Sequence, residues 1–99
     1  MRLLSVPAER LLAETLLAAG ALNQAQAHFE RVVAELEQSN AQSELAMACD
    51  GYGRVLAWQG QATEARRYLT QALIILGQLG MHSESQRVRA VIEALAVDS

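Results

Sequence analysis

The side chains that could carry out chemistry in this sequence are few and lie far apart. The chain holds one cysteine, Cys49, and two histidines, His28 and His82, and none of these stands close to another in the sequence. Metal sites and activated nucleophiles need ligands or bases gathered at short, characteristic spacings. We therefore predict no metal site, no cofactor and no catalytic centre, and we interpret Cys49 as a small buried apolar residue.

Two pairs of opposite charges stand four residues apart, which puts both members of each pair on the same side of a helix. Arg10 precedes Glu14, and Asp50 precedes Arg54, with Trp58 one further turn along. The simplest interpretation is two ion pairs within helices, each worth a few tenths of a kcal/mol. The alternative is a binding surface anchored by Arg54 and Trp58, because Arg and Trp are enriched among the residues that dominate interfaces. A further role open to Trp58 is to cover an apolar end of the fold.

The elements that must position these side chains are predicted to be helices. Hydrophobic residues make up 52% of the 99 residues, and most of them are alanine and leucine, whereas only 4% of the chain is aromatic. Alanine and leucine are strong helix formers, while β-sheet cores favour β-branched and aromatic residues. The composition therefore predicts one all-α domain over residues 1–99 and excludes an all-β fold.

The net charge and the single cysteine indicate which partners and which cellular location to expect. The net charge is −3 and the basic residues are all scattered arginines, which disfavours nucleic-acid binding because counterion release needs a clustered basic surface. A single cysteine cannot form an internal disulfide, and Glu9, Arg10 and Glu14 interrupt the apolar N-terminal stretch. We expect no leader or membrane span, no nucleic-acid partner and a cytoplasmic protein.

The sequence repeats itself at an offset of 40 residues. The segment GALNQAQAHFERVV, which starts at Gly20, corresponds to GQATEARRYLTQAL, which starts at Gly60. The apolar spacing predicts a helix, a turn and a second helix in each repeat, over about 6–40 for repeat one and about 41–80 for repeat two. A fifth helix over about 83–97 corresponds to the first helix of a third repeat and is predicted to cap the stack.

Local signals predict where the helices begin and end. Glycine readily adopts the positive φ that ends a helix, and small polar residues break helices, so breaks are expected at Gly20, residues 39–40, Gly60 and Gly80. A hydroxyl oxygen can accept a hydrogen bond from the free amides of a first turn. We therefore predict N-caps at Ser5, Thr63 and Ser83.

Matching positions of the two repeats share a pattern of small and large apolar residues. Each first helix has a small residue at its centre with an apolar residue just before it, each turn has a glycine, and each second helix has an alanine followed four residues later by a large apolar residue. These positions are Leu12 and Tyr52, Ala13 and Gly53, Gly20 and Gly60, Ala25 and Ala65, and Phe29 and Leu69. This pattern resembles the tetratricopeptide repeat family. The family's usual period is about 34 residues, and the longer repeat of this chain is similar to those of kinesin light chains and of bacterial regulators.

The resemblance implies an α–α superhelix, in which helix pairs stack and the first helices line a concave groove that binds a peptide or protein segment. Helical phase then puts seven side chains in the groove: Arg10, Glu14, Met47, Asp50, Arg54, Trp58 and Arg87. We expect a non-catalytic protein–protein interaction module that is part of a larger bacterial regulatory or signalling protein.

A second hypothesis is that the domain mainly pairs with itself. Two full repeats are fewer than the roughly three that repeat proteins usually need for stability. The first helix also carries more leucines than one buried stripe can hold. Exposed apolar patches are uncommon on monomers, so a two-fold dimer through the first helix is expected, with Leu3, Leu4 and Leu11 as its contact residues.

Overall fold

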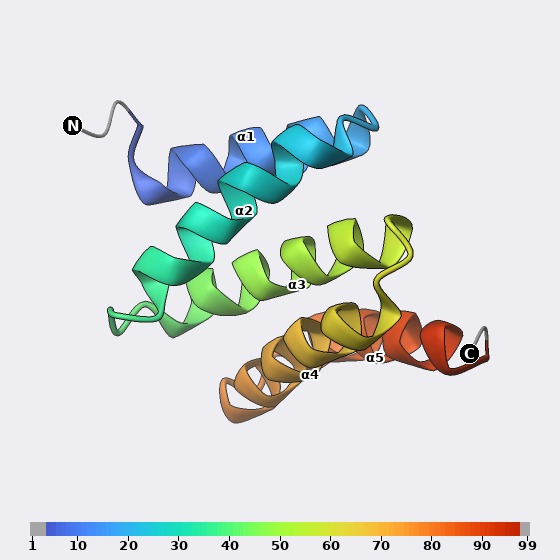
Figure 1. Ribbon diagram of the computed structural model, residues 1–99. Helices are drawn as coiled ribbons and strands as arrows, with labels where there is room; N and C mark the ends of the chain where they lie inside the picture. The colour runs from blue at the N-terminus through green and yellow to red at the C-terminus, as the bar shows by residue number, and fades with distance from the viewer. Residues whose placement is uncertain (1–3, 98–99) are drawn as a thin grey trace.

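The computed structural model describes residues 4–97 of the chain and is all-helical over that range. Helix α1 covers Val6–Ala18, α2 covers Leu22–Leu36, α3 covers Gln42–Trp58, α4 covers Ala62–Gln78 and α5 covers His82–Val97 (Figure 1). The part of the chain described contains no strand. The prediction of an all-α chain with five helices is confirmed for these residues, and every predicted break falls between two helices.

Three of the four turns between helices have the same glycine-based geometry. Gly20, Gly60 and Gly80 have φ values of 82°, 83° and 72°. In each turn the residue after the glycine donates its amide to a carbonyl five residues back, as Ala21 does to Leu16 at 2.9 Å and Gln61 does to Leu56 at 2.9 Å. This is the Schellman arrangement, which satisfies carbonyls left free at a helix end. The predicted positive φ at Gly20 is therefore confirmed.

The turn between α2 and α3 is closed by a hydroxyl group instead of a glycine. Ser39 Oγ donates to the carbonyl of Leu36 at 3.0 Å and accepts from the amide of Ala41 at 3.2 Å. Ser39 therefore satisfies backbone groups on both sides of the turn. This explains how the chain leaves α2 and enters α3 with every φ of the turn negative.

Of the three predicted N-caps, one is confirmed and two are wrong. Ser5 caps α1, because its Oγ accepts from the amide of Ala8 at 3.3 Å. Helices α4 and α5 begin at Ala62 and His82, one residue before Thr63 and Ser83. The Schellman turns leave a single residue between the glycine and the next helix, so the helix has already started when the hydroxyl residue is reached.

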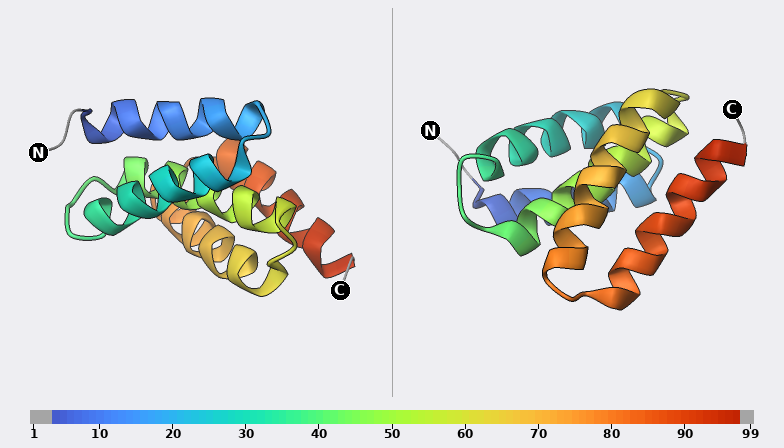
Figure 2. Two further views of the ribbon diagram at one scale, coloured as in Figure 1. Left: turned by 45° about the horizontal axis from the view of Figure 1, so that its top comes forward. Right: turned by 90° about the horizontal axis from the view of Figure 1, so that it is seen from below.

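Helix α3 lies at the centre of the molecule and packs against each of the other helices. Figure 1 shows α3 between the pair α1 and α2 and the pair α4 and α5, and the right view of Figure 2 shows α5 at the edge of the molecule away from α2. The sequence of α3 allows this because it is rich in small side chains, of which Ala46, Ala48, Cys49, Gly51 and Gly53 are all buried. Small residues let neighbouring helices approach closely.

The two glycines of α3 lie against Phe29 of α2 and Leu69 of α4, which are the largest fully buried side chains of the described residues. A Cβ atom on Gly51 would clash with the ring of Phe29 from α2, and a Cβ atom on Gly53 would lie 2.5 Å from Cγ of Leu69 from α4. Phe29 and Leu69 are both fully buried. The core is therefore built around the α2–α3 and α3–α4 contacts.

Cys49 of α3 and Leu12 of α1 differ in burial. Cys49 is buried as predicted, and burial raises the pKa of its thiol to about 12. Leu12, in contrast, is 36% exposed, although its repeat counterpart Tyr52 is buried. The ring of Tyr52 packs at a tilt against that of Tyr68 of α4, with the ring centres 4.6 Å apart. In the first repeat the position of Tyr68 is taken by His28, which contacts Glu9. No helix of residues 4–97 is both long enough and apolar enough to cross a membrane.

Candidate functional site

Two adjoining hollows lie on the side of the molecule formed by α1, α3 and α5, which we call the inner face. The first, the charged hollow, has a volume of about 330 Å³ and is lined by Arg10, Glu14, Ala46, Met47, Asp50, Leu76, Met81, Glu84 and Arg87. The second, the tryptophan hollow, has a volume of about 280 Å³ and is lined by Glu14, Leu17, Ala18, Arg54, Ala57, Trp58 and Val91. Glu14 of α1 borders both hollows, so the two lie next to each other between α1 and α3.

Arg10 connects α1 to α3 at one side of the charged hollow. Its Nη1 lies 2.6 Å from Glu14 Oε2 on α1, and its Nε lies 2.8 Å from Glu44 Oε2 on α3. Only 11% of the Arg10 side chain is exposed. One guanidinium group is therefore shared by two carboxylates and is largely withdrawn from solvent.

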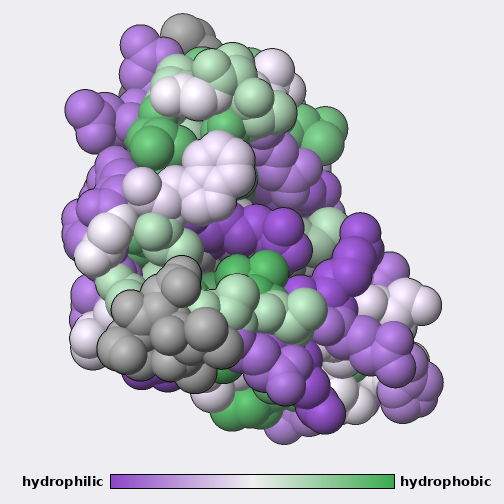
Figure 3. All heavy atoms as spheres, turned by 90° about the vertical axis from the view of Figure 1, so that its right-hand side faces the viewer, coloured by the Kyte–Doolittle hydropathy of each residue, from purple (hydrophilic) through white to green (hydrophobic). Residues whose placement is uncertain are grey.

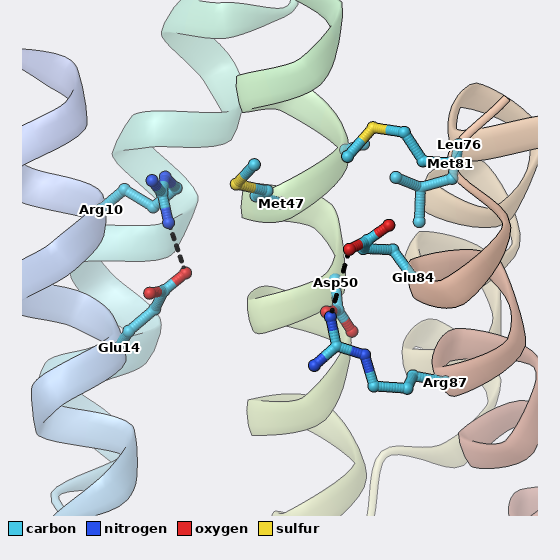
Figure 4. Close-up of a pocket in the computed structure, with 9 residues that line it drawn as sticks. Arg10, Glu14, Met47, Asp50, Leu76, Met81, Glu84 and Arg87 are labelled. Atoms are coloured by element: carbon cyan, nitrogen blue, oxygen red, sulfur yellow. Dashed lines mark hydrogen bonds and ion pairs between the residues drawn. The ribbon is translucent and has the colours of Figure 1, made fainter. Parts of the chain in front are cut away.

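Helices α3 and α5 supply the opposite side of the charged hollow. Figure 4 shows Glu84 and Arg87 of α5 directed toward Asp50 of α3, with Arg10 and Glu14 of α1 facing them across Met47. The pair on α5 is loose, with 3.6 Å between Arg87 Nη2 and Glu84 Oε1. Met47, Met81 and Leu76 add apolar side chains to the lining of this hollow.

The tryptophan hollow combines an exposed aromatic ring with one arginine. Trp58 is the last residue of α3 and is 66% exposed. Arg54, one turn earlier, donates through Nε to Asp50 Oδ1 at 2.7 Å. Leu17 of α1 and Val91 of α5 complete the apolar lining. At the end of the molecule where α3 finishes, hydrophobic and hydrophilic side chains are interspersed (Figure 3).

All seven side chains assigned to the groove from the sequence border one of these hollows. Five of them line the charged hollow, and Arg54 and Trp58 line the tryptophan hollow. Sequence reasoning missed Glu44 and Glu84, although each stands three residues before an assigned residue on the same helix and could have been found from that spacing. It also missed Met81 and Leu76, which reach the hollow only because α4 turns back into α5 there.

A buried carboxylate joins α1 to α2 away from the inner face. Glu9 is 4% exposed, and its Oε2 lies 2.8 Å from His28 Nδ1 and 3.1 Å from Arg31 Nε. His28 therefore has a structural partner that its position in the sequence did not indicate. Among residues 4–97 no three His, Cys, Asp or Glu side chains are grouped closely enough to hold a metal ion.

Of the leucines assigned to self-association, Leu11 lies on α1 and Leu4 precedes that helix. Leu4 is 40% exposed and Leu11 is 55% exposed, and Leu3 lies outside the described residues. Apolar side chains are also exposed near the other end of the chain, where Ile74 and Leu79 of α4 and its following turn face solvent. Large apolar side chains are thus exposed in the region of α1 and in the region of α4, in addition to Trp58 on the inner face.

No family model, no curated protein and no solved structure matches this chain. A fold alone does not define a function, which depends on the chemistry of a site. The side chains of the two hollows are therefore the basis for inferring what the molecule does.

Proposed function

We propose that this chain is a non-catalytic protein–protein interaction module that binds a peptide or protein segment on its inner face. The observation that carries the proposal is the exposed ring of Trp58 beside Arg54 in a hollow that lies next to a second one. Tryptophan and arginine are the side chains most enriched among residues that dominate binding energy. An exposed tryptophan with an apolar surround is a typical anchor for a partner.

The dimensions of the inner face suit an extended segment better than a compact small molecule. The charged hollow is at the small end of the range of about 300–1,000 Å³ that is typical of ligand pockets, and the tryptophan hollow lies just below that range. The stretch of α3 from Met47 to Trp58 is roughly 16 Å long at the rise of an α-helix. That length matches about five residues of extended chain.

We also propose that the helices form a tetratricopeptide-like α–α superhelix and that the module belongs to a larger bacterial regulatory or signalling protein. Support for the superhelix comes from the repeated turn geometry at Gly20 and Gly60 and from the contacts of α3 with both α1 and α5. The chain offers two full repeats and one further helix, and repeat proteins use such stacked first helices to form extended binding surfaces.

The test is to select binding peptides from a random library and to compare three proteins. We expect Trp58→Ala to keep its helicity and to bind the selected peptides about tenfold more weakly, because it removes the central anchor. Ile74→Ala is the matched control, because Ile74 is exposed on α4 and borders neither hollow. Unchanged affinity in Trp58→Ala, or a bound structure with the peptide only on α2 and α4, would contradict the proposal.

Self-association through α1 is a second candidate function, favoured by the exposure of Leu4 and Leu11. A two-fold contact would cover both side chains on each copy. Sedimentation over a concentration series should show a dimer for the parent chain and a monomer for the double variant Leu4→Glu/Leu11→Glu. A parent that stays monomeric at high micromolar concentration excludes this candidate and leaves the inner face unaffected.

A further inference from the structure

The charged hollow carries more negative than positive charge. We count the charged groups that line the hollow or form an ion pair with a residue that lines it. The carboxylates are Glu14, Glu44, Asp50 and Glu84. The guanidinium groups are Arg10, Arg54 and Arg87. The excess matters because the hollow is partly shielded from solvent, where charges interact more strongly than in bulk water.

Of the two guanidinium groups that line the hollow, Arg10 is the less able to meet a ligand. Arg10 is held by Glu14 and Glu44 and is only 11% exposed. Glu14 is far more accessible, and Glu84 is held by Arg87 only at 3.6 Å. Asp50 bonds Arg54 through Oδ1. Arg87, whose side chain is 70% exposed, is the accessible guanidinium group of this lining, and it stands against the three carboxylates of Glu14, Asp50 and Glu84, so the lining carries a net negative charge.

The lining of the same hollow is partly apolar. Met47, Met81 and Leu76 belong to it together with the carboxylates, and methionine adapts its shape to what packs on it. A lysine or arginine side chain has a matching construction, with an apolar stem and a charged head that reaches polar groups. An acidic side chain would meet a lining of net negative charge and has no stem of comparable length.

The geometry points to a partner segment that carries a basic side chain for the charged hollow and a bulky apolar side chain for the tryptophan hollow. This inference rests on the proposed function and specifies its ligand. The basic head meets Glu14 and Glu84, and the apolar side chain packs on Trp58 with Leu17 and Val91. Asp50 and Ala57 mark the two hollows on α3, and their separation of about 10 Å corresponds to roughly three residues of extended chain.

The experiment uses the fluorescence of Trp58, which is the only tryptophan in the chain. The probes are short Gly/Ser peptides without Trp or Tyr that carry Arg and Phe three residues apart, in both orders. Matched peptides replace Arg by Gln, Arg by Glu, or Phe by Ser. We expect the Arg/Phe peptide to bind tightest in one order, with about fivefold loss for Gln and a greater loss for Glu. The Arg–Gln difference should shrink as salt is raised.

Two variants test whether the preference for a basic side chain arises in the charged hollow. Glu14→Gln and Glu84→Gln should each reduce the difference in affinity between the Arg peptide and the Gln peptide, because each removes one of the two carboxylates that meet the basic head. Glu64→Gln is the control, because it makes the same charge change on an exposed residue of α4 that borders neither hollow. Two variants are used because Glu14 also holds Arg10 and its loss could disturb the fold.

The outcomes separate this inference from the proposed function. Equal affinity for the Arg, Gln and Glu peptides would overturn the basic preference and leave peptide binding intact. Tighter binding of the Glu peptide would also overturn it and would identify Arg54 and Arg87 as the ligand-binding charges. If no peptide of the set binds, and library selection finds no binder that depends on Trp58, the proposed function fails together with the inference.

Discussion

Helices α1 and α3 occupy the same position in the two repeats but are held in different ways. Helix α3 is surrounded by its neighbours and packs through small residues such as Gly51 and Gly53. Helix α1 has neighbours on one side, and its buried residues are Ala13 and the carboxylate of Glu9. The comparison teaches that the position of a residue in the repeat determines whether it can face a neighbouring helix. Whether the residue is buried depends on which helices pack against that face.

The largest expected effect comes from filling the close contact of α3. Gly53→Leu should destabilise the chain by about 3 kcal/mol, because overpacking a close contact forces backbone and side chains apart. Its Cβ alone would lie 2.5 Å from Cγ of Leu69. Thermal unfolding followed by circular dichroism should show a midpoint lowered by roughly 10 °C or more. A variant that melts within a degree or two of the parent would mean that α3 and α4 do not pack as described.

In α1 the contact most sensitive to substitution is the buried carboxylate of Glu9. Glu9→Gln should cost about 2 kcal/mol, because it leaves His28 and Arg31 without the buried carboxylate that holds both. Urea unfolding would measure this loss. Glu64→Gln is the matched control, since Glu64 is exposed and its contact to Arg67 is 3.6 Å long. Equal stability of the two variants would show that Glu9 does not anchor α1.

A pH effect should report on the buried thiol of α3. Burial raises the pKa of Cys49 from 9.0 to about 12, so between these values the unfolded chain releases the proton and the folded chain keeps it. Stability from this group is complete below pH 9 and is lost as the pH rises toward 12. At pH 10 the loss should be about 1 kcal/mol.

Urea midpoints at pH 8 and pH 10 would measure this effect, with Cys49→Ala as the comparison. The parent should lose more stability than the variant over that interval. The pKa of Tyr52 is also raised to about 12, first by burial, and this group acts in the same direction in both proteins. Identical losses in the parent and in Cys49→Ala would rule out a buried neutral thiol.

The smallest expected effect concerns Gly77, a helical glycine that no close contact requires, in contrast to Gly53. A Cβ atom on Gly77 of α4 would meet nothing within 4 Å. Gly77→Ala should therefore stabilise the chain by about 0.5 kcal/mol, because alanine loses less backbone entropy in a helix. The same change in α3, Gly53→Ala, should destabilise it. Chemical unfolding of both variants would show opposite signs if α3 is the helix that needs its glycines.

Local chemistry made much of the helical architecture predictable from the sequence. The all-α class follows from a composition rich in alanine and leucine, and the breaks at Gly20, Gly60 and Gly80 follow from backbone freedom that glycine carries in any context. Helical phase also placed Arg10 and Glu14 on one side of α1 and Asp50 and Arg54 on one side of α3. Each of these features depends on residues close together in the chain.

Tertiary structure alone decided the features that depend on contacts between helices. The sequence did not indicate that Phe29 rests on Gly51, that Glu9 is buried between His28 and Arg31, or that Leu12 stays exposed. It also did not indicate that Glu44 shares Arg10 with Glu14, or that Met81 enters the charged hollow. Helical periodicity shows which face of a helix a residue occupies, whereas burial and ion pairing depend on what lies against that face, and packing across the whole chain determines that.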